Sequence, residues 1–279
     1  MSFGEMVQAA FPPQIWIILI VCAVLCAVGF YKFVYFLSVG YGFAVCGAGI
    51  AILVLYGRGL GIWTIILCLL FVVYGIRLGG FLLWREIRSA SYRKTLKTAG
   101  GDKPMPVFVK AAIWVCVAVM YVLQISPVFY RAAGSAADGG SSDSITAVVA
   151  AVIMAAALII ESIADKQKSA AKEKNPGRFC DTGLYRIVRC PNYLGEVLFW
   201  TGVLISGFGA LEGAIQWGIA VLGYILIVYV MFSGAKRLEI RQNKNYGADP
   251  EYRKYVESTP ILIPLVPLYH LKDIRFIVA

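Results

Sequence analysis

Long apolar stretches alternate with short polar connections along this chain. The run 15–56 is about twice as long as the roughly 20 residues that one bilayer-spanning helix needs, so it predicts two spans with a break within 29–42, near Lys32. Further apolar stretches predict spans over 61–84, 107–125, 144–160, 193–208 and 213–232. The pattern therefore predicts an all-α, polytopic membrane protein with seven transmembrane helices.

Composition supports this prediction. Of the 279 residues, 59% are hydrophobic and 15% are charged, whereas ordinary soluble domains have about 45–50% apolar and about 25% charged residues. This excludes a soluble globular enzyme, a disordered chain and a disulfide-stapled secreted module. The first five of the seven cysteines lie in apolar stretches and none form a CxxC pair, so we expect neither a disulfide nor a metal site.

Basic residues are distributed unevenly between the predicted connections. The chain has 26 Lys and Arg against 16 Asp and Glu, a net charge of +10. Six basic residues lie in 85–106, seven in 163–190 and eight after residue 232, whereas the opposite connections carry only two basic residues, Arg58 and Arg131, and the last of them carries Glu212. The positive-inside rule then predicts an outside N-terminus and a cytoplasmic C-terminus, with the polar loop 134–143 facing outward. We interpret the basic excess as a topology signal, and we expect no nucleic-acid partner.

One polar stripe lies on the helix that leaves the membrane after the fifth span. Glu161, Asp165, Lys168 and Lys172 follow at i, i+4, i+7 and i+11, which places them on one helix face. A solvated helix end with weak acid–base pairs is one interpretation. Glu161 favours another, because it follows the apolar run 155–160, where an ionisable group needs a cavity or a partner.

A second polar group begins the sixth span. Asn192 and Glu196 lie one turn apart after Pro191, a residue typical of a helix N-terminus. One interpretation is that Glu196 only interacts favourably with the dipole at the N-terminus of the helix. We favour a pocket for a polar, aromatic ligand such as a nucleotide, for which the surrounding stretch supplies further groups: Tyr185, Arg186, Arg189 and Tyr193.

The third span contains an arginine. Arg77 lies seven residues inside its cytoplasmic end, and Tyr74 is its i−3 neighbour on the same face. Arg77 either snorkels to the interface or points at an anion or a cavity. No acidic residue occurs between Glu5 and Glu86, so we expect no acid in the first three spans.

The basic, aromatic tail after residue 232 is expected to fold back over the cytoplasmic face as a lid. His270, the single histidine, is expected to be an ordinary exposed residue. Neither GxGxxG nor GxxxxGK[ST] occurs, and zinc-type spacing is absent as well. A nucleotide, if bound, would therefore lie between helices on the cytoplasmic side, and no metal is expected.

Three strings together resemble one family. The string GLYRIVRCPNYLGE at 183–196 resembles the signature of the steroid 5-alpha-reductase family, most closely its bacterial, DUF1295-like branch, in which GLWxYxRHPNYxGE is typical. The strings ESIADKQK at 161–168 and DPEYRKY at 249–255 are similar to the same branch. The resemblance covers about residues 155–265, and it favours a bacterial inner membrane.

The resemblance implies a seven-helix reductase that binds NADPH from the cytosol and reduces the C=C bond of an enone, typically a 3-oxo-Δ4 steroid, that enters from the bilayer. It implies one integral membrane domain over 1–279, with 15–126 on the substrate side and 144–265 on the cofactor side. Tyr74 and Glu196 are the predicted catalytic residues. The predicted cofactor-binding residues are Arg77, Arg88, Asp165, Lys168, Lys172, Tyr185, Arg189, Asn192, Tyr193, Glu196 and Arg237.

The chain also departs from the family. Cys190 stands where the bacterial branch has His, and Arg237, Glu239 and Arg241 occupy the region of a His-rich patch. The early-helix Glu of the steroid enzymes has no counterpart, so we expect Tyr74 to donate to the substrate carbonyl. Two alternatives remain: an isoprenylcysteine-type membrane methyltransferase that uses S-adenosylmethionine and prefers a Glu-Glu pair near Glu239, and a transporter or lipid-binding scaffold.

Overall fold

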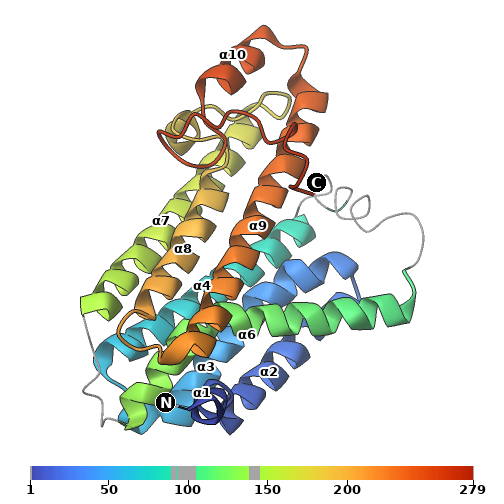
Figure 1. Cartoon of the computed structure of the whole chain (residues 1–279). Helices are drawn as coiled ribbons and strands as arrows, with labels where there is room; N and C mark the ends of the chain where they lie inside the picture. Colours follow the sequence, from blue (N-terminus) through green and yellow to red (C-terminus); the bar gives the residue numbers. More distant parts are fainter. Residues whose placement is uncertain (1, 89–92, 94–104, 138–144, 279) are drawn as a thin grey trace. The chain divides into compact units, whose positions relative to one another are not determined.

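The computed structural model describes residues 2–88, 93 and 105–137 and residues 145–278. The described elements are helical (Figure 1). The α-helices are α1 (Phe3–Ala10), α2 (Pro13–Cys26), α3 (Val39–Tyr56), α4 (Ile62–Arg88), α6 (Val107–Ala137), α7 (Ile145–Lys174), α8 (Pro191–Ser206), α9 (Gly213–Tyr246) and α10 (Pro250–Ser258). The all-α prediction is confirmed. Most of the basic segment 85–106 and of the loop 134–143 lies outside the described residues.

Six segments of the described chain are long and apolar enough to cross a membrane, which makes the protein a multi-pass integral membrane protein. They are Phe3–Phe30, Val39–Gly59, Ile62–Arg88, Val107–Ala137, Ile145–Lys174 and Gly213–Tyr246. The predicted sixth span, 193–208, corresponds to α8, which has only 16 residues and is not among these six segments. The count of seven and the orientation therefore stay predictions.

The helices begin close to where the predicted spans begin, but several continue beyond the predicted ends of the spans. The fourth span was expected to end at residue 125, yet α6 continues to Ala137 past Pro127. Proline cannot donate to the carbonyl of Leu123, and the hydroxyl of Ser126 donates to that oxygen instead, over 2.8 Å. α7 and α9 likewise continue to Lys174 and Tyr246. A helix does not need to end where the apolar stretch ends, because its backbone bonds persist in water.

The chain forms two compact units, and each is described by itself. The first comprises Met1–Ala151 and Val203–Tyr224, and the second comprises Val152–Gly202 and Ile225–Ala279. The predicted parts, 15–126 and 144–265, divide the chain differently.

Glycines bring α3 and α4 of the first unit close together. A Cβ on Gly75 would lie closer than 3.0 Å to the carbonyl oxygen of Gly42, and a Cβ on Gly49 would lie 2.7 Å from that of Cys68. Small residues allow such backbone contact between membrane helices. The crossing fixes Tyr74, next to Gly75, in a buried position.

A buried carboxylate joins the break after α2 to the end of α4. Glu86 accepts hydrogen bonds from the ammonium of Lys32 and the hydroxyl of Tyr35. These two helix ends therefore lie at the same end of the first unit. Glu86 lies just beyond the predicted third span, 61–84, which contains no acid, and α4 includes it because the helix continues to Arg88.

Arg131 was expected in a polar connection, and this is wrong. It lies within α6, and its side chain is fully buried in the first unit. Its guanidinium donates to the carbonyl oxygens of Ser206 (2.6 Å) and Phe208 (3.2 Å) and to Thr146 Oγ1 (3.0 Å). These three acceptors explain how a buried arginine is tolerated.

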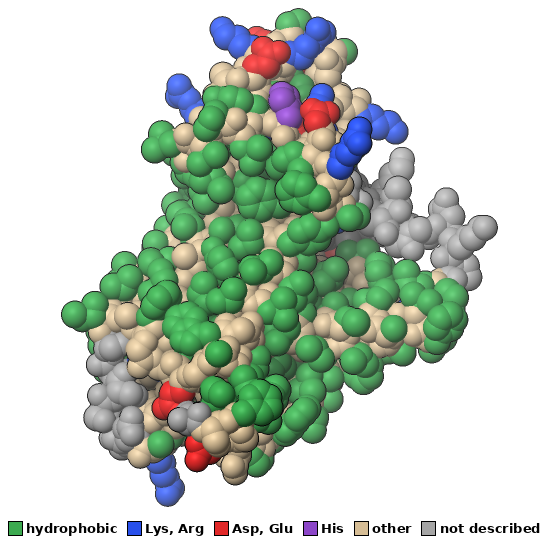
Figure 2. All heavy atoms as spheres, viewed as in Figure 1, with side chains coloured by type: hydrophobic (Ala, Val, Ile, Leu, Met, Phe, Trp, Pro, Cys, Tyr) green, Lys and Arg blue, Asp and Glu red, His purple; other side chains and the backbone are tan. Residues whose placement is uncertain are grey.

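The second unit is a helix bundle closed by the C-terminal segment. Its core includes one cluster of buried side chains from α9, the start of α8 and the segment after α10: Cys190, Ala235, Leu238, Ile261, Leu262, Leu271 and Ile277. In this unit, charged side chains gather around α10 and the segment after it, whereas the visible face of its helices is mostly hydrophobic (Figure 2).

Candidate functional site

The first two turns of α8 carry two polar residues of the second unit, the half-buried Asn192 and the buried Glu196. Asn192 and Glu196 are i, i+4 neighbours on one helix face, and Glu196 is buried. Asn192 Oδ1 is buried and has no hydrogen-bond partner among the described residues, and the same holds for Ser233 Oγ on α9. The helix expected to start at Pro191 is confirmed.

Tyr193 packs against α9. A Cβ on Gly234 would lie 3.2 Å from Cζ of the Tyr193 ring, so this ring lies against a glycine. Tyr193 also borders the buried cluster around Cys190, which places half of the ring in the core of the unit. Arg237, one turn further along α9, is exposed.

The polar stripe on α7 has a buried and a half-buried part. Glu161 is 1% exposed, and its Cγ is closer than 3.0 Å to where a Cβ on Gly195 of α8 would stand. Asp165 and Lys168 follow it on the same helix face and are half-buried. The predicted helical stripe is therefore real, and the glycine of the string NYLGE makes room for Glu161.

Lys172, the last member of the stripe, is fully engaged within the chain. Its ammonium donates to the carbonyl oxygens of Pro176 (3.2 Å) and Arg178 (2.5 Å) and to the hydroxyl of Tyr246 (2.6 Å). A lysine ammonium has three donors, so all of them are occupied in this arrangement. In the structure Lys172 holds the loop after α7. The cofactor-binding role that the resemblance assigns to Lys172 stays a prediction.

Tyr185 is a packing residue of the connection between α7 and α8. Its hydroxyl donates to the carbonyl oxygen of Ala164 (3.4 Å), and its own carbonyl oxygen accepts from the hydroxyl of Tyr255 (2.6 Å). Burial raises the pKa of both phenols. Within this connection Gly183 has a φ of +61° and lies against the Gln167 amide, whose oxygen accepts from the backbone N–H of Leu184.

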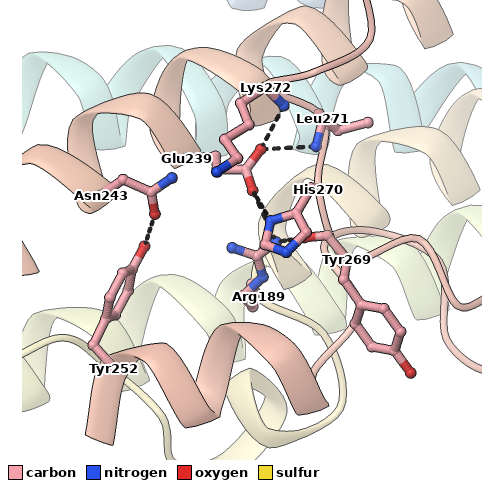
Figure 3. A network of polar contacts seen from close by, with 8 residues as sticks. All are labelled: Arg189, Glu239, Asn243, Tyr252, Tyr269, His270, Leu271 and Lys272. Carbon is pink, nitrogen blue, oxygen red and sulfur yellow. Dashed lines mark hydrogen bonds and ion pairs between the residues drawn. The ribbon is translucent and has the colours of Figure 1, made fainter. Parts of the chain in front are cut away.

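Figure 3 shows a polar network that the sequence did not reveal. Arg189 Nη2 donates to Glu239 Oε1 (3.3 Å) and to the carbonyl oxygen of Tyr269, and both charged side chains are buried. His270 Nδ1 lies 3.1 Å from the same Glu239 oxygen. His270, expected to stand alone, is thus attached to a buried carboxylate 31 residues away. No local pattern signals such a distant pairing.

The C-terminal segment completes this network instead of ending as a simple tail. The backbone N–H groups of Leu271 and Lys272 donate to Glu239 Oε2 over 2.8 and 2.9 Å. Lys236 donates to the carbonyl oxygens of Ile274 (2.9 Å) and Ile277 (3.0 Å). The tail after residue 232 thus consists of the end of α9, helix α10 and a segment that folds onto α9 within the second unit, and its place on the cytoplasmic face stays a prediction.

Two pockets open in the second unit. One, of about 350 Å³, is lined by Asn243, Gly247, Tyr252, Arg253, Val256, Glu257, His270 and Lys272. The other, of about 570 Å³, lies beside the end of α7 and is lined by Gln167, Ala170, Ala171, Lys174, Asn175, Arg178, Phe179, Asp181 and Thr182. Within the described residues, no group of three His, Cys, Asp or Glu side chains is arranged to hold a metal ion.

The remaining predicted site residues belong to the first unit. Tyr74 is buried, and its ring centroid lies 5.9 Å from that of Tyr41. Arg77 is half-buried, and Arg88 is exposed with its guanidinium 5.7 Å from the ring centroid of Trp84. That these residues act together with those of the second unit stays a prediction.

Comparison with known proteins identifies the family to which the chain is similar. The family described as protein of unknown function (DUF1295) matches residues 21–259, which is most of the chain. No curated protein and no solved structure matches the chain. The resemblance to steroid 5-alpha-reductases stays a prediction.

Proposed function

The chain belongs to the DUF1295 family, and we propose that it is a membrane-embedded, NADPH-dependent reductase of an enone C=C bond. A 3-oxo-Δ4 steroid or a similarly apolar enone that enters from the bilayer is the proposed substrate. The observation that carries the proposal is the buried Asn192 Oδ1, which lacks a partner among the described residues, in the string that resembles the reductase signature.

The free acceptor on Asn192 suits the nicotinamide end of the cofactor. Leaving a buried acceptor without a hydrogen bond costs about 1–3 kcal/mol, so this atom calls for a donor from outside the described chain. The carboxamide of nicotinamide offers two N–H donors. Glu196, one turn further on the same face of α8 and buried, supplies a second acceptor beside it.

The basic groups of the second unit suit the phosphates of the cofactor. Lys168 is half-buried on the helix face that also carries Asp165, and Arg189 is buried with two nitrogens that lack partners among the described residues. Lys and Arg are the usual side chains that bind phosphate. NADPH carries a 2′-phosphate that NADH lacks, so a cluster of Lys and Arg side chains favours NADPH.

Bound NADPH would supply a hydride to the β-carbon of the enone and leave as NADP⁺, and the α-carbon of the resulting enolate would take its proton from solvent water. The residues of the chain bind and orient the reactants and stabilise the negative charge that develops on the carbonyl oxygen. A preorganised donor at that oxygen contributes several kcal/mol. Tyr74 is our candidate for this donor, because its phenol is buried and α4, which carries it, is an apolar helix. An apolar substrate would reach such a helix by diffusion from the lipid.

A test compares the full chain in lipid nanodiscs with three variants. We expect NADPH-dependent conversion of a 3-oxo-Δ4 steroid that Glu196→Gln abolishes and Tyr74→Phe weakens, while NADPH raises the melting temperature. Lys244→Gln, which changes an exposed residue of α9, is the matched control and keeps full activity. Stabilisation by S-adenosylmethionine but not by NADPH would overturn the proposal in favour of a methyltransferase, and full activity in both site variants would overturn the site.

A further inference from the structure

The carboxylate of Glu239 is saturated by its neighbours. Oε1 faces Arg189 Nη2 and His270 Nδ1, and Oε2 accepts from the backbone N–H groups of Leu271 and Lys272. A carboxylate has about four acceptor positions, so all are used. Glu239 therefore has no capacity left for a further donor of Arg189.

Arg189 is left with unused donors. It is 1% exposed, and its Nη2 makes the two bonds to Glu239 and the carbonyl oxygen of Tyr269. Nε and Nη1 are buried without a partner among the described residues. Together they carry three N–H groups. Buried guanidinium donors without acceptors are costly, so these atoms require an acceptor that the described chain does not supply.

Arg189 is not itself a lining residue of the pocket of about 350 Å³, but it is linked to two residues that are, His270 and Tyr252. His270 lines the pocket and shares Glu239 Oε1 with Arg189. Tyr252 lines it as well, and its hydroxyl donates to Asn243 Oδ1 over 2.7 Å. Burial raises the pKa of Tyr252 to about 12, and the nearby positive charge of Arg189 opposes that rise. Figure 3 shows the guanidinium between the Glu239–His270 pair and the Tyr252–Asn243 pair.

The charge of the pocket lining is mainly positive. Arg253 and Lys272 are full cations, His270 becomes one when protonated, and Glu257 is the single acid among the lining residues. The volume lies in the range of small-molecule sites. The lining therefore suits a small anion with several acceptor oxygens, for which arginine and lysine are the usual partners.

We propose that this pocket is a binding site for a phosphate group, with Arg189 as its buried cation and Arg253 and Lys272 at its mouth. Glu239 is the positioning residue, because it fixes Nη2 and leaves the remaining N–H groups of Arg189 for the ligand. The phosphate belongs either to a nucleotide or to free inorganic phosphate, which share this chemistry. The inference deepens the proposed function, which already places Arg189 at the cofactor phosphates, and it is tested without an enone, so that the two can fail separately.

Inorganic phosphate is the probe, measured by equilibrium dialysis and by thermal shift on the full chain in nanodiscs at constant ionic strength. We expect saturable binding that exceeds binding of chloride. Arg253→Gln and Lys272→Gln, at exposed positions that do not threaten the fold, should each weaken binding about tenfold, the size of one charged hydrogen bond. Arg189→Gln should abolish it.

Lys254→Gln is the matched control, because Lys254 is an exposed cation next to Arg253 that does not line the pocket. It should bind phosphate like the wild type. Displacement of phosphate by NADPH would assign the site to a nucleotide, and persistence of bound phosphate would assign it to the free ion. Absence of phosphate binding, or an equal loss in Lys254→Gln, would overturn the proposal. Neither readout uses an enone, so a failed reductase assay leaves the result intact.

Discussion

Glu161 on α7 lies directly against Gly195 on α8, closer than any side chain at position 195 would allow. A Cβ there would stand within 3.0 Å of Glu161 Cγ and 3.1 Å from the carbonyl oxygen of Ala157. The glycine thus has a packing reason, and it determines where the buried carboxylate lies relative to Asn192 and Glu196 in the same unit.

Gly195→Ala should therefore destabilise the protein and reduce ligand binding. Overpacking costs about 1–3 kcal/mol, which exceeds the roughly 1 kcal/mol that alanine gains in a helix. Thermal unfolding in nanodiscs measures the loss. Gly218→Ala on α9 is the control, since a Cβ there meets no atom within 4 Å. It should stabilise by about 0.5–1 kcal/mol, and equal behaviour of the two variants would contradict the packing argument.

Glu239→Gln should loosen the C-terminal segment. In the wild type, Arg189 and the backbone N–H of Leu271 donate to the carboxylate of Glu239. The amide of glutamine has only one oxygen, so its N–H groups would face some of these donors. Removing one partner of a buried ion pair costs about 3–5 kcal/mol. Limited proteolysis should cut after residue 259 in this variant but not in the wild type. Glu173→Gln, at an exposed position of α7, should be resistant, and equal resistance of Glu239→Gln would refute the role of the network.

Cys190 should make folding stability fall at alkaline pH. Burial raises the pKa of its thiol to about 11 from 9.0, although Lys168 and Arg189 act in the opposite direction. The folded state therefore holds this proton more tightly than the unfolded state. The contribution is complete below pH 9.0 and is lost as the pH rises to about 11.

The difference in unfolding free energy between the wild type and Cys190→Ala isolates this contribution from that of the buried tyrosines. It should shrink by on the order of 2 kcal/mol across that window. Iodoacetamide should also react slowly with Cys190 at pH 8, because the thiolate is the reactive form. A difference that stays constant with pH would exclude the shift.

Lys172→Met should weaken the loop after α7. Three hydrogen bonds of the ammonium are lost, each worth about 0.5–1.5 kcal/mol or more, and hydrogen exchange of residues 175–178 measures the effect. Lys174→Met, at an exposed neighbour, is the comparison. A selective loss of NADPH affinity with unchanged exchange would instead support the phosphate contact that the resemblance implies.

The helices were predictable because apolar length and helix starts are local properties. α4, α6, α7 and α9 begin within one residue of their predicted positions. The helix ends were not predictable in this way. The end of an apolar stretch indicates where lipid contact ends, but the backbone hydrogen bonds of the helix continue beyond it. Arg131 was misplaced for a related reason. Its acceptors on Ser206 and Phe208 lie about 75 residues away, and no pattern near Arg131 signals them.

The site was predictable in part. The α8 start with Asn192 and Glu196 and the α7 stripe are confirmed as helical positions, since both follow from helix spacing. The attachment of His270 to Glu239 was not predictable, because it depends on how the segment after α10 folds onto α9. A histidine in a basic tail has the same sequence context whether or not it meets a carboxylate.

The contacts of Lys236 and Glu239 set an order for biosynthesis. Both side chains lie on α9. Lys236 bonds to residues 274 and 277, and Glu239 bonds to residues 270–272 in addition to Arg189, so these C-terminal partners leave the ribosome some 30 residues later. Until then α9 carries an ammonium and a carboxylate that its own helix does not satisfy. A chain that ends before residue 270 would therefore leave the Lys236 ammonium without these acceptors and the Glu239 carboxylate with Arg189 alone.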